Sequence, residues 1–267
     1  MAAVVPLGAQ QVADTAFRPP IEKPAYPTGK GPVVLIDEAH NNFHTAAGRY
    51  LPFAELLKRD GYVVRASRAP FKAEALRGGS VLVIANATQL FAPDEIAATR
   101  EWVSAGGSLL LIADHPPFLA PAAELGEVLG IRFFDGSALE PNNRSGRIVF
   151  RRSDGTLMDH PLTKNIDQVA TFTGSAFQLD VPGHPLLVFA GDAFLWRSET
   201  EQNRLPLKGH LQGAVLELGK GKVAVFGEAA MFSAQLSGPE KNPMGMNAAI
   251  AKQNPQFLLN VMHWLTN

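Results

Sequence analysis

"VVLIDEAHNNFHT", residues 33–45, is a run of apolar residues that leads directly into acids, asparagines and histidines. A short, uninterrupted apolar run is typical of a strand buried on both faces, as in a parallel sheet. The polar residues that follow do not belong inside such a strand, because an unpaired polar group is costly to bury. The stretch therefore predicts a core strand whose carboxyl end carries either a functional site or a well-capped turn.

The same alternation continues along the first half of the chain. The apolar runs "YVVRAS", "VLVIANA", "SLLLIAD" and "IRFF" alternate with segments of helical spacing at residues 52–61, 92–107 and 120–130. Pro52 suits a first helical turn, and Gly61 suits a helix C-terminus. Apolar strands that alternate with helices are typical of a parallel sheet covered on both faces. The pattern predicts an α/β fold with a mostly parallel, doubly wound sheet.

After about residue 137 the pattern changes to strands separated by turns. "GRIVFRR", "VATFTGSAFQLD", "PLLVFAGDAFLWRS" and "AVLELG" read as strands, and "LGKGKV" reads as a hairpin turn before "KVAVFGE". We expect these strands to be antiparallel additions to the same sheet. The closing segment "NPQFLLNVMHWLTN" has the apolar spacing of a packing helix. Residues 33–267 are therefore predicted to form a single α/β domain.

The overall composition narrows the functional classes. The chain has 267 residues, of which 46% are apolar and 18% charged, and its formal net charge is −1. This charge gives no electrostatic basis for a nucleic-acid partner. No apolar run approaches the roughly 18–20 residues of a membrane span. The chain has no cysteine, which excludes thiolate nucleophiles, disulfides and cysteine-based zinc sites. We expect a small-molecule substrate, and the composition leaves the oligomeric state open.

Residues 1–32 are predicted to be an extended N-terminal segment. It begins "AAVVPLGAQQVADTAF" and continues into a proline-rich stretch up to Pro32. The start lacks the basic region of a complete secretory signal but is compatible with the remnant of one. A signal-peptide remnant predicts a periplasmic or secreted protein, and a cytoplasmic protein with an irregular terminus is the alternative.

Polar side chains follow four of the apolar runs, at the point where each predicted strand ends. The segments are 37–44 (DEAHNNFH), 85–88 (ANAT), 113–118 (ADHPPF) and 227–230 (GEAA). In open parallel sheets, ligands bind outside the carboxyl ends of the strands. Because these ends meet at one edge of the sheet, we expect the four segments to converge there and form the site.

The first segment holds two histidines, His40 and His44, four residues apart. One helical turn would place both rings on the same face, which suits a metal ion. The alternative is that Asn41, Asn42 or Thr45 caps a helix and that the histidines are only polar neighbours.

Asp37 and Glu38 are the residues of this segment that capping explains least. The connection from the strand to a helix near Pro52 is also longer than the 2–6 residues usual for such loops, and long loops are often functional. We interpret the segment as one wall of an active site.

Asp114 and His115 end the strand "SLLLI", and two prolines follow them. A rigid turn that holds an acid beside an imidazole suits a general base or a metal site. The alternative is that Asp114 caps a helix and His115 is exposed. Glu228 follows the buried run "KVAVF" and Gly227, and it is either a site residue or a charge at a helix N-terminus.

Five stretches together carry a family resemblance. They are "VLIDEAHNNFHT", "RYLPFAELLKRDGY", "WVSAGGSLLLIADHPPF", "LQGAVLELGKGKVAVFGEAAMFSAQL" and "NPQFLLNVMHWL", and they span most of residues 33–265. With them the chain resembles the class I glutamine amidotransferase-like superfamily, and within it bacterial proteins with a DUF4350-type domain. The resemblance implies a flavodoxin-like fold and says less about function.

The sequence departs from that superfamily at one decisive place. Amidotransferases of this fold carry a nucleophilic cysteine in the turn after a central strand, and the matching turn here, "ADHPPF", holds Asp114 and His115 instead. Glutamine hydrolysis through a thioester is therefore excluded. Either this chain uses metal- or carboxylate-assisted hydrolysis, or it only binds a ligand.

The first hypothesis is a metal-assisted hydrolase that acts on the carbonyl of an ester or lactone. A divalent ion, zinc or calcium, would activate water at the carboxyl edge of the sheet. The predicted catalytic residues are Asp114, His115, Glu228 and Glu38; the predicted substrate-binding residues are Asp37, Asn41, Asn42 and Asn86; the predicted metal ligands are His40, His44 and His115.

The second hypothesis is a non-catalytic module that binds a carbohydrate-like ligand within an envelope or transport assembly. The resemblance implies it, because members of this fold occur as non-catalytic parts of such assemblies. Asn41, Asn42 and Asn86 would then hydrogen-bond the ligand. A binding module has no need of a metal with open coordination positions, so metal content distinguishes the two hypotheses.

Overall fold

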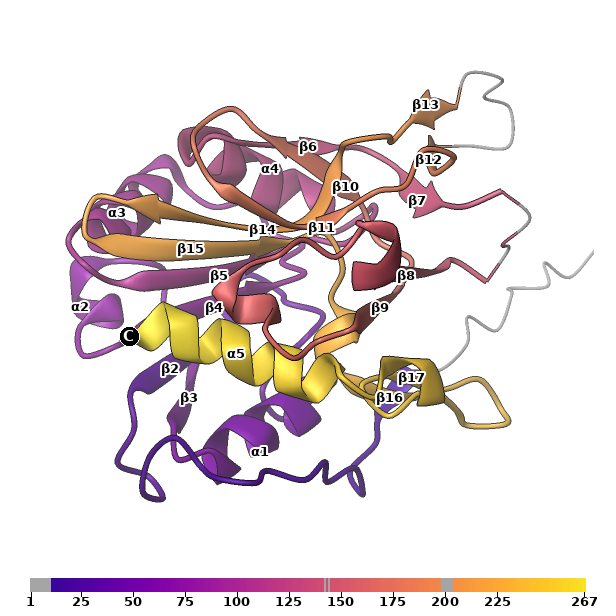
Figure 1. Cartoon of the computed structure of the whole chain (residues 1–267). Helices are drawn as coiled ribbons and strands as arrows, with labels where there is room; N and C mark the ends of the chain where they lie inside the picture. Colours follow the sequence, from indigo (N-terminus) through magenta and orange to yellow (C-terminus); the bar gives the residue numbers. More distant parts are fainter. Residues whose placement is uncertain (1–10, 142, 144, 198–203) are drawn as a thin grey trace, which may run out of the picture.

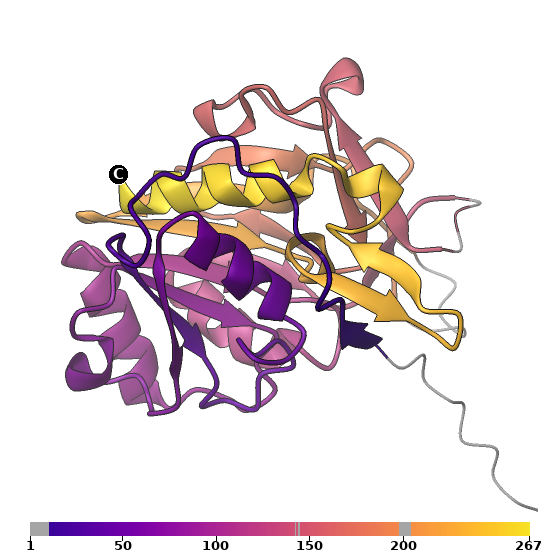
Figure 2. The ribbon, with the colours of Figure 1, turned by 90° about the horizontal axis from the view of Figure 1, so that it is seen from below.

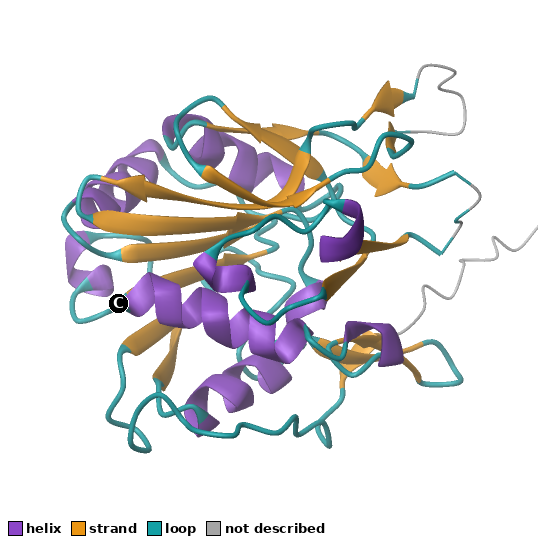
Figure 3. Cartoon of the chain, viewed as in Figure 1, coloured by secondary structure: helices purple, strands orange, loops and turns teal. Residues whose placement is uncertain are grey.

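The structure is a computed structural model that describes residues 11–141, 143, 145–197 and 204–267. It is a mixed α/β fold in which helices cover both faces of a central sheet (Figures 1 and 3). In the described part of the chain this sheet has nine strands, with the order β3-β2-β4-β5-β15-β14-β10-β6 and β11 paired to β14. The prediction of an α/β fold is confirmed, and the sheet is mixed in direction.

One half of the central sheet is parallel. Its strands are β3 (Val63–Ser67), β2 (Val33–Asp37), β4 (Val81–Ala85), β5 (Ser108–Ile112) and β15 (Gly221–Phe226). All residues of β4 and β5 are buried, which explains their uninterrupted apolar sequences. The structure corrects one expectation here, because β15 comes from the second half of the chain yet pairs in parallel with β5. The carboxyl ends of all five strands therefore lie at one edge, and the four predicted polar segments follow β2, β4, β5 and β15.

The other half is antiparallel. It contains β14 (Leu211–Leu218), β10 (Ala176–Leu179), β6 (Ile131–Phe134) and β11 (His184–Val188). The glycine-rich turn joins β14 to β15 in a hairpin, as predicted. The strand "IRFF" was expected in the parallel series, but as β6 it pairs antiparallel with β10 at the far edge. Its placement depends on a partner distant in sequence, which local periodicity does not reveal.

Each face of the sheet packs against its own set of helices. Helices α1 (Leu51–Arg59) and α5 (Asn254–Thr266) cover one face, and α2 (Ala73–Leu76), α3 (Pro93–Ser104) and α4 (Leu119–Val128) cover the other (Figure 2). The four longer helices were predicted, because each has an apolar stripe that is buried only against a sheet. The single turn α2 was not predicted.

Smaller strands and 3-10 turns complete the fold beside the central sheet. The strands are β1 (Gln11–Ala13), β16 (Ala234–Ser237) and β17 (Asn242–Gly245) in one sheet, β7 (Ser137–Leu139), β12 (Phe194–Trp196) and β13 (Leu205–Pro206) in a second, and β8 (Arg147–Arg151) paired with β9 (Gln168–Phe172). The 3-10 turns are Arg152–Asp154, Pro161–Thr163, Ala230–Phe232 and Ala249–Ala251. Of these elements, β1, β8, β16, β17 and the turn Ala230–Phe232 contribute residues to the cavity above the strand ends.

The N-terminal segment crosses the α1 and α5 side of the domain after β1 (Figure 2). The signal-peptide remnant was predicted partly on residues 1–10, which lie outside the described residues. Where the chain is described, no helix combines the length and the apolar character needed to cross a membrane.

Asp60 attaches this segment to the core. It is fully buried, its Oδ1 accepts a hydrogen bond from the Ala25 N–H at 2.8 Å, and its Oδ2 lies 2.6 Å from Nε2 of His263 on α5. The Asp60→Ala substitution leaves both donors without this acceptor, so we expect the free energy of unfolding to fall by about 1–3 kcal/mol. Urea denaturation measures the change, and the exposed Asp94→Ala is the control. A loss no larger than that of the control would contradict this role of Asp60.

Candidate active site

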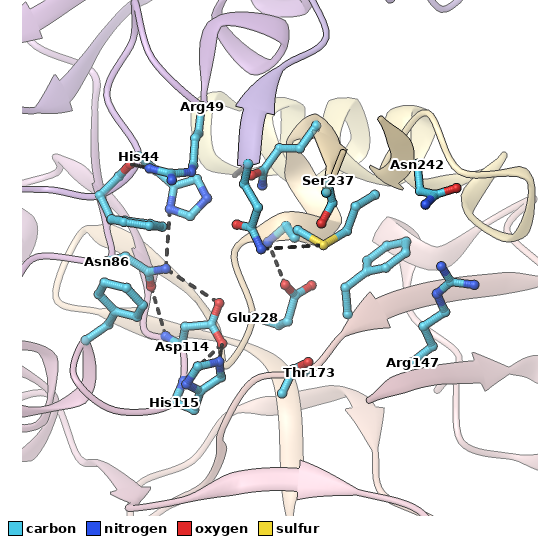
Figure 4. Close-up of a pocket in the computed structure, with 18 of the residues that line it drawn as sticks. His44, Arg49, Asn86, Asp114, His115, Arg147, Thr173, Glu228, Ser237 and Asn242 are labelled. Carbon is cyan, nitrogen blue, oxygen red and sulfur yellow. Dashed lines mark hydrogen bonds and ion pairs between the residues drawn. The ribbon is translucent and has the colours of Figure 1, made fainter. Parts of the chain in front are cut away.

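A cavity of about 810 Å³ lies at the carboxyl end of the parallel half of the sheet (Figure 4). His44, Asn86, Asp114 and Glu228 line it, one after each of the strands β2, β4, β5 and β15. The opposite wall comes from β1, β8, β16, β17 and the turn after β9. The predicted convergence of the four strand ends therefore occurs, and it occurs at a cavity.

Asn86 links the first three of these strand ends. It has a left-handed backbone with φ of 51°, which asparagine tolerates better than most residues. Its Oδ1 accepts a hydrogen bond from the Asp114 N–H at 2.9 Å, and this fixes the orientation of the amide. The Nδ2 group then donates to Nδ1 of His44 at 3.3 Å and reaches Oδ2 of Asp114 at 3.5 Å.

His44 is a neutral imidazole held in one tautomer. Because Asn86 donates to Nδ1, that nitrogen carries the lone pair and Nε2 carries the proton. Burial, assisted by the positive charge of Arg49, lowers the pKa of His44 to about 3. Nε2 is buried and has no hydrogen-bond partner among the described residues.

Glu228 is the deepest acid of the cavity and is fully buried. Its two carboxyl oxygens accept hydrogen bonds from the backbone N–H groups of Ala230 at 2.6 Å and Met231 at 2.8 Å. Burial raises the pKa of Glu228 well above its usual value, and the nearby charge of Asp114 raises it further. At neutral pH we therefore expect Glu228 to hold a proton.

Asp114 and His115 lie side by side in the same cavity. Burial raises the pKa of Asp114, and the charge and backbone N–H of His115 oppose this rise. The Nδ1 atom of His115 lies 2.9 Å from the carbonyl oxygen of Pro116, which can only accept, so Nδ1 carries the proton. In the neutral imidazole, Nε2 of His115 is then the acceptor, and it lies 3.8 Å from Oδ1 of Asp114.

Backbone strain marks the opposite wall. Thr173 lines the cavity with φ of 89°, a left-handed conformation that a β-branched residue rarely adopts. The next residue, Gly174, has φ of 118°, and a Cβ there would lie 2.8 Å from the Cβ of Glu228. The turn thus packs its backbone directly against the buried acid, and strain of this kind concentrates at functional sites.

The structure places Asp37 and His40 in a separate buried cluster. Nδ1 of His40 lies 2.9 Å from Oδ2 of Asp37, and Nε2 lies 2.9 Å from Oε1 of Glu95 on α3. The rings of Phe71 and Phe91 pack on the imidazole. The cluster does not line the cavity, so Asp37 holds the loop in place rather than contacting a substrate there.

Three other predicted site residues also lie outside the cavity. Glu38 accepts a hydrogen bond from the Ala46 N–H at 3.0 Å and pairs with Arg68 at 3.0 Å. Asn41 is exposed, and Asn42 is buried with its Oδ1 accepting from the His40 N–H at 3.2 Å. The side chains of Glu38 and Asn42 brace the loop that carries His44. The structure gives Glu38 no contact with the acids of the cavity.

The three predicted metal ligands do not come together. His44 and His115 line one cavity, but both ring nitrogens of His40 are taken by carboxylates of the buried cluster. The expected helical turn is absent from the described loop, so His40 and His44 do not share a face. Over the ranges that the structure describes, no three His, Asp or Glu side chains are grouped to hold a metal ion.

Several cavity residues were not found from the sequence. Arg49 lies at the end of the same long loop as His44, and its position in that loop was the available signal. Arg147, Thr173 and Gln235 come from the second half of the chain. Their approach depends on strand pairing between distant segments, and nothing local in the sequence predicts it.

Comparison with solved structures shows a shared fold. The mmIFT52 N-terminal domain superposes with a TM-score of 0.67 and 16% identity over 88% of this chain and 97% of that chain. Two cytoplasmic proteins, STM1381 from Salmonella typhimurium LT2 and STM3548 from Salmonella typhimurium, give TM-scores of 0.58 and 0.57 with 16% and 15% identity. Each alignment covers 88% of this chain, with 99% of STM1381 and 98% of STM3548. At these identities the likeness shows the fold alone.

No curated protein matches the chain. A family model does match, over residues 43–241, a range that includes Asn86, Asp114 and Glu228 and most of the central sheet. The family is described as a domain of unknown function. This match covers more than half of the chain and confirms the resemblance predicted from the sequence at the level of the family. The chain belongs to the DUF4350 family.

Proposed function

We propose that this protein is a hydrolase that acts at the carboxyl edge of the sheet. It cleaves the bond between the acyl carbon and the alcohol oxygen of an ester or lactone. The observation that carries the proposal is the pair of buried carboxyl groups, Asp114 and Glu228, in one cavity with the free Nε2 of His115. Environments that hold one carboxyl protonated beside a second that ionises supply an acid and a base at neutral pH. Burying two acids together is costly for stability, and catalysis gives a reason for it.

The position of the cavity supports the same proposal. In chain order the parallel strands β3-β2-β4-β5-β15 run 2-1-3-4-5, the order of doubly wound flavodoxin-like sheets. Such folds bind ligands where the strand order reverses, here between β2 and β4, and His44 and Asn86 follow these two strands. We include in the proposal a flavodoxin-like origin of this half, related to the amidotransferase-like superfamily.

In the proposed reaction a water molecule lies between Oδ1 of Asp114 and Nε2 of His115, whose 3.8 Å separation allows one water to hydrogen-bond to both. The water oxygen forms a bond to the acyl carbon and gives one proton to Asp114. His115 accepts the second hydrogen bond and orients the water.

The carbon–oxygen bond to the leaving alcohol then breaks, and the proton of Glu228 goes to the departing oxygen. The products are a carboxylic acid and an alcohol, joined in one molecule when the substrate is a lactone. The proton on Asp114 returns to Glu228 or to solvent before the next turnover.

The metal-assisted form of the hypothesis remains a prediction with its own measurement. Because the described side chains do not form a group of three metal ligands, the reaction proposed above uses only side chains and water. Elemental mass spectrometry of the purified protein and of His115→Ala measures the metal content directly. About one equivalent of zinc or calcium that is lost in the variant would require the metal-assisted route.

The first test of the proposal is an activity screen of the wild-type protein. We expect hydrolysis of p-nitrophenyl acetate, of an alkyl ester or of a lactone at a rate above the uncatalysed reaction, with and without EDTA. The His115→Gln variant should lose about tenfold or more, since it removes the hydrogen bond that positions the attacking water. No hydrolysis of any substrate, also after addition of divalent ions, would overturn the proposed hydrolase.

A second candidate function, binding of a carbohydrate-like ligand without chemistry, rests on Gln235. This side chain is buried in β16 and lines the cavity, and its Oε1 has no hydrogen-bond partner among the described residues. A hydroxyl group of a bound ligand would satisfy it. Binding of a sugar without turnover would favour this function.

A further inference from the structure

Two buried donors at one end of the cavity lack acceptors. Nε2 of His44 and Nε of Arg49 are both buried, and in the described structure neither has a hydrogen-bond partner. Both residues line the cavity, and Figure 4 shows them at the same end of it, apart from Glu228 and Arg147. A buried donor without a partner costs about 1–3 kcal/mol, so two of them side by side call for a ligand.

The tautomer of His44 determines what kind of ligand atom is needed. The Asn86 amide donates to Nδ1, so the unpartnered Nε2 is an N–H donor. The Nε atom of arginine is always a donor. The missing partner is therefore an acceptor oxygen, and the positive charge of Arg49 favours one that carries negative charge.

Arg49 is held in place before any ligand binds. Its guanidinium carbon lies 3.5 Å from the centroid of the Phe43 ring, and its Nη1 group donates to the Phe43 carbonyl oxygen at 3.4 Å. Stacking on the Phe43 ring and the hydrogen bond to the Phe43 carbonyl oxygen limit the positions of the planar guanidinium group, whose N–H donors form a fork. A preorganised cation of this kind loses little freedom when it binds an anion.

Glu228, the most buried acid of the cavity, does not neutralise this end. Burial and the charge of Asp114 both raise the pKa of Glu228, so we expect Glu228 to be protonated and uncharged at neutral pH. Nor does a carboxylate of the described chain pair with the Arg49 guanidinium. The His44–Arg49 end is thus a positively charged pocket next to the reactive centre.

We propose that the His44–Arg49 end binds a carboxylate group of the substrate. A carboxylate has enough lone pairs to accept from both N–H groups at once, and charge-assisted hydrogen bonds are the stronger ones. The substrate class is then a small carboxylic acid whose ester or lactone carbonyl extends toward Asp114 and His115. That the bound carboxylate belongs to a substrate rests on the proposed hydrolase, whereas binding of the carboxylate itself does not.

The test uses succinate and its neutral diamide, succinamide, as probes in isothermal titration calorimetry near neutral pH. We expect succinate to bind at least tenfold more tightly than succinamide to the wild-type protein. Arg49→Gln should lose at least tenfold in succinate affinity, and Arg49→Lys should lose part of it, since lysine keeps the charge but not the fork. The exposed Arg100→Gln on α3 is the matched control and should bind like the wild type.

A measurement on the unmodified sequence keeps the proposal testable if an Arg49 variant does not fold. In ¹⁵N NMR of the wild-type imidazoles we expect His44 as the Nε2–H tautomer, with its Nε2–H signal shifted by succinate and not by succinamide. Equal binding of the two probes, an unaffected Arg49→Gln, or a loss seen only in Arg147→Gln would overturn the proposal. Tighter Arg49-dependent binding of inorganic phosphate than of succinate would also overturn it.

Measuring binding and hydrolysis on the same proteins tests the carboxylate site and the hydrolase activity separately. The Asp114→Asn variant should still bind succinate while losing hydrolysis, because Asp114 is not part of the His44–Arg49 end. Succinate binding without hydrolysis in the wild type would refute the hydrolase and leave the carboxylate site in place. Hydrolysis without Arg49-dependent binding would refute the carboxylate site alone.

Discussion

The Asp114→Asn variant is expected to lower kcat/KM for the best ester or lactone by about 10²–10⁴-fold, the usual contribution of a positioned general base. Asparagine keeps the size of the side chain and can still accept from the His115 N–H, so the fold should be retained. Steady-state kinetics measure the loss, and thermal unfolding checks the fold. The exposed Asp94→Asn, on the first turn of α3, is the control for the same chemical change.

The pH profile of the wild type should carry the signature of the two acids. Activity should rise as Asp114 ionises, with an apparent pKa above 3.8 because burial raises it, and should fall as Glu228 loses its proton. Glu228→Gln should remove the fall at high pH. A profile with neither limb altered by these two variants would contradict their roles as base and acid.

The leaving group separates the two roles further. A nitrophenolate leaves without a proton, so Glu228→Gln should affect p-nitrophenyl esters less than alkyl esters, which need an acid at the leaving oxygen. Asp114→Asn should affect both substrates alike, because water attack precedes departure in each. Equal losses for both substrates in Glu228→Gln would contradict its role as the acid.

The His40→Ala variant is expected to have the largest effect on stability, a loss of about 3–5 kcal/mol in the free energy of unfolding. His40 is 2% exposed and bridges the carboxylates of Asp37 and Glu95. Removal of the imidazole leaves two buried carboxylates without their shared partner, the case in which breaking a buried ion pair is most costly. Urea denaturation of the wild type and of the variant measures the loss, with the exposed His184→Ala as the control.

The loss should depend on pH in a defined direction. Burial lowers the pKa of His40, but the hydrogen bonds and charges of Asp37 and Glu95 outweigh it and raise this pKa above 6.5. A raised pKa gives stability that is fully present below pH 6.5 and is lost as the pH rises through the folded-state pKa.

Glu95 sets the lower limit of the pH range in which the His40 cluster stabilises the fold. Burial raises its pKa, but the backbone N–H groups of Ala92 and Phe71 and the His40 ring outweigh it and lower the pKa below 4.5. Its contribution is therefore present above pH 4.5 and is lost as the pH falls through the folded-state pKa. The destabilisation by His40→Ala should be greatest between pH 4.5 and 6.5 and smaller near pH 9. A loss that grows from pH 6 to pH 9 would contradict this account.

The His40 cluster also shows how a loop residue supports a site that it does not touch. The loop from Glu38 to Tyr50 carries His44 and Arg49 to the cavity, and the His40 bridge anchors its first turn to α3 through Glu95. The unusual length of this loop between strand and helix correctly singled out a segment that lines the cavity. Its assignment residue by residue was not possible, because alternate residues of one loop face different neighbours.

The sequence alone determined the layers and the edge of the sheet that carries the cavity. Apolar runs of strand length, helical periodicity and the end signals of helices are local, so they predict the strands of the parallel half, the four longer helices and the polar segments at the strand ends. Asn86, Asp114, His115, His44 and Glu228 line the cavity for that reason.

Only the tertiary structure decided which polar residues share that cavity. Asp37 and His40 are as polar as Asp114 and His115. His40 nevertheless contacts Glu95, which is distant in sequence, and lies in a separate buried cluster. Strand β15 joins the parallel half, and Thr173 approaches Glu228, because chain segments far apart pair across the sheet. Side-chain direction, burial and pKa depend on these long-range contacts, and periodicity carries no information about them.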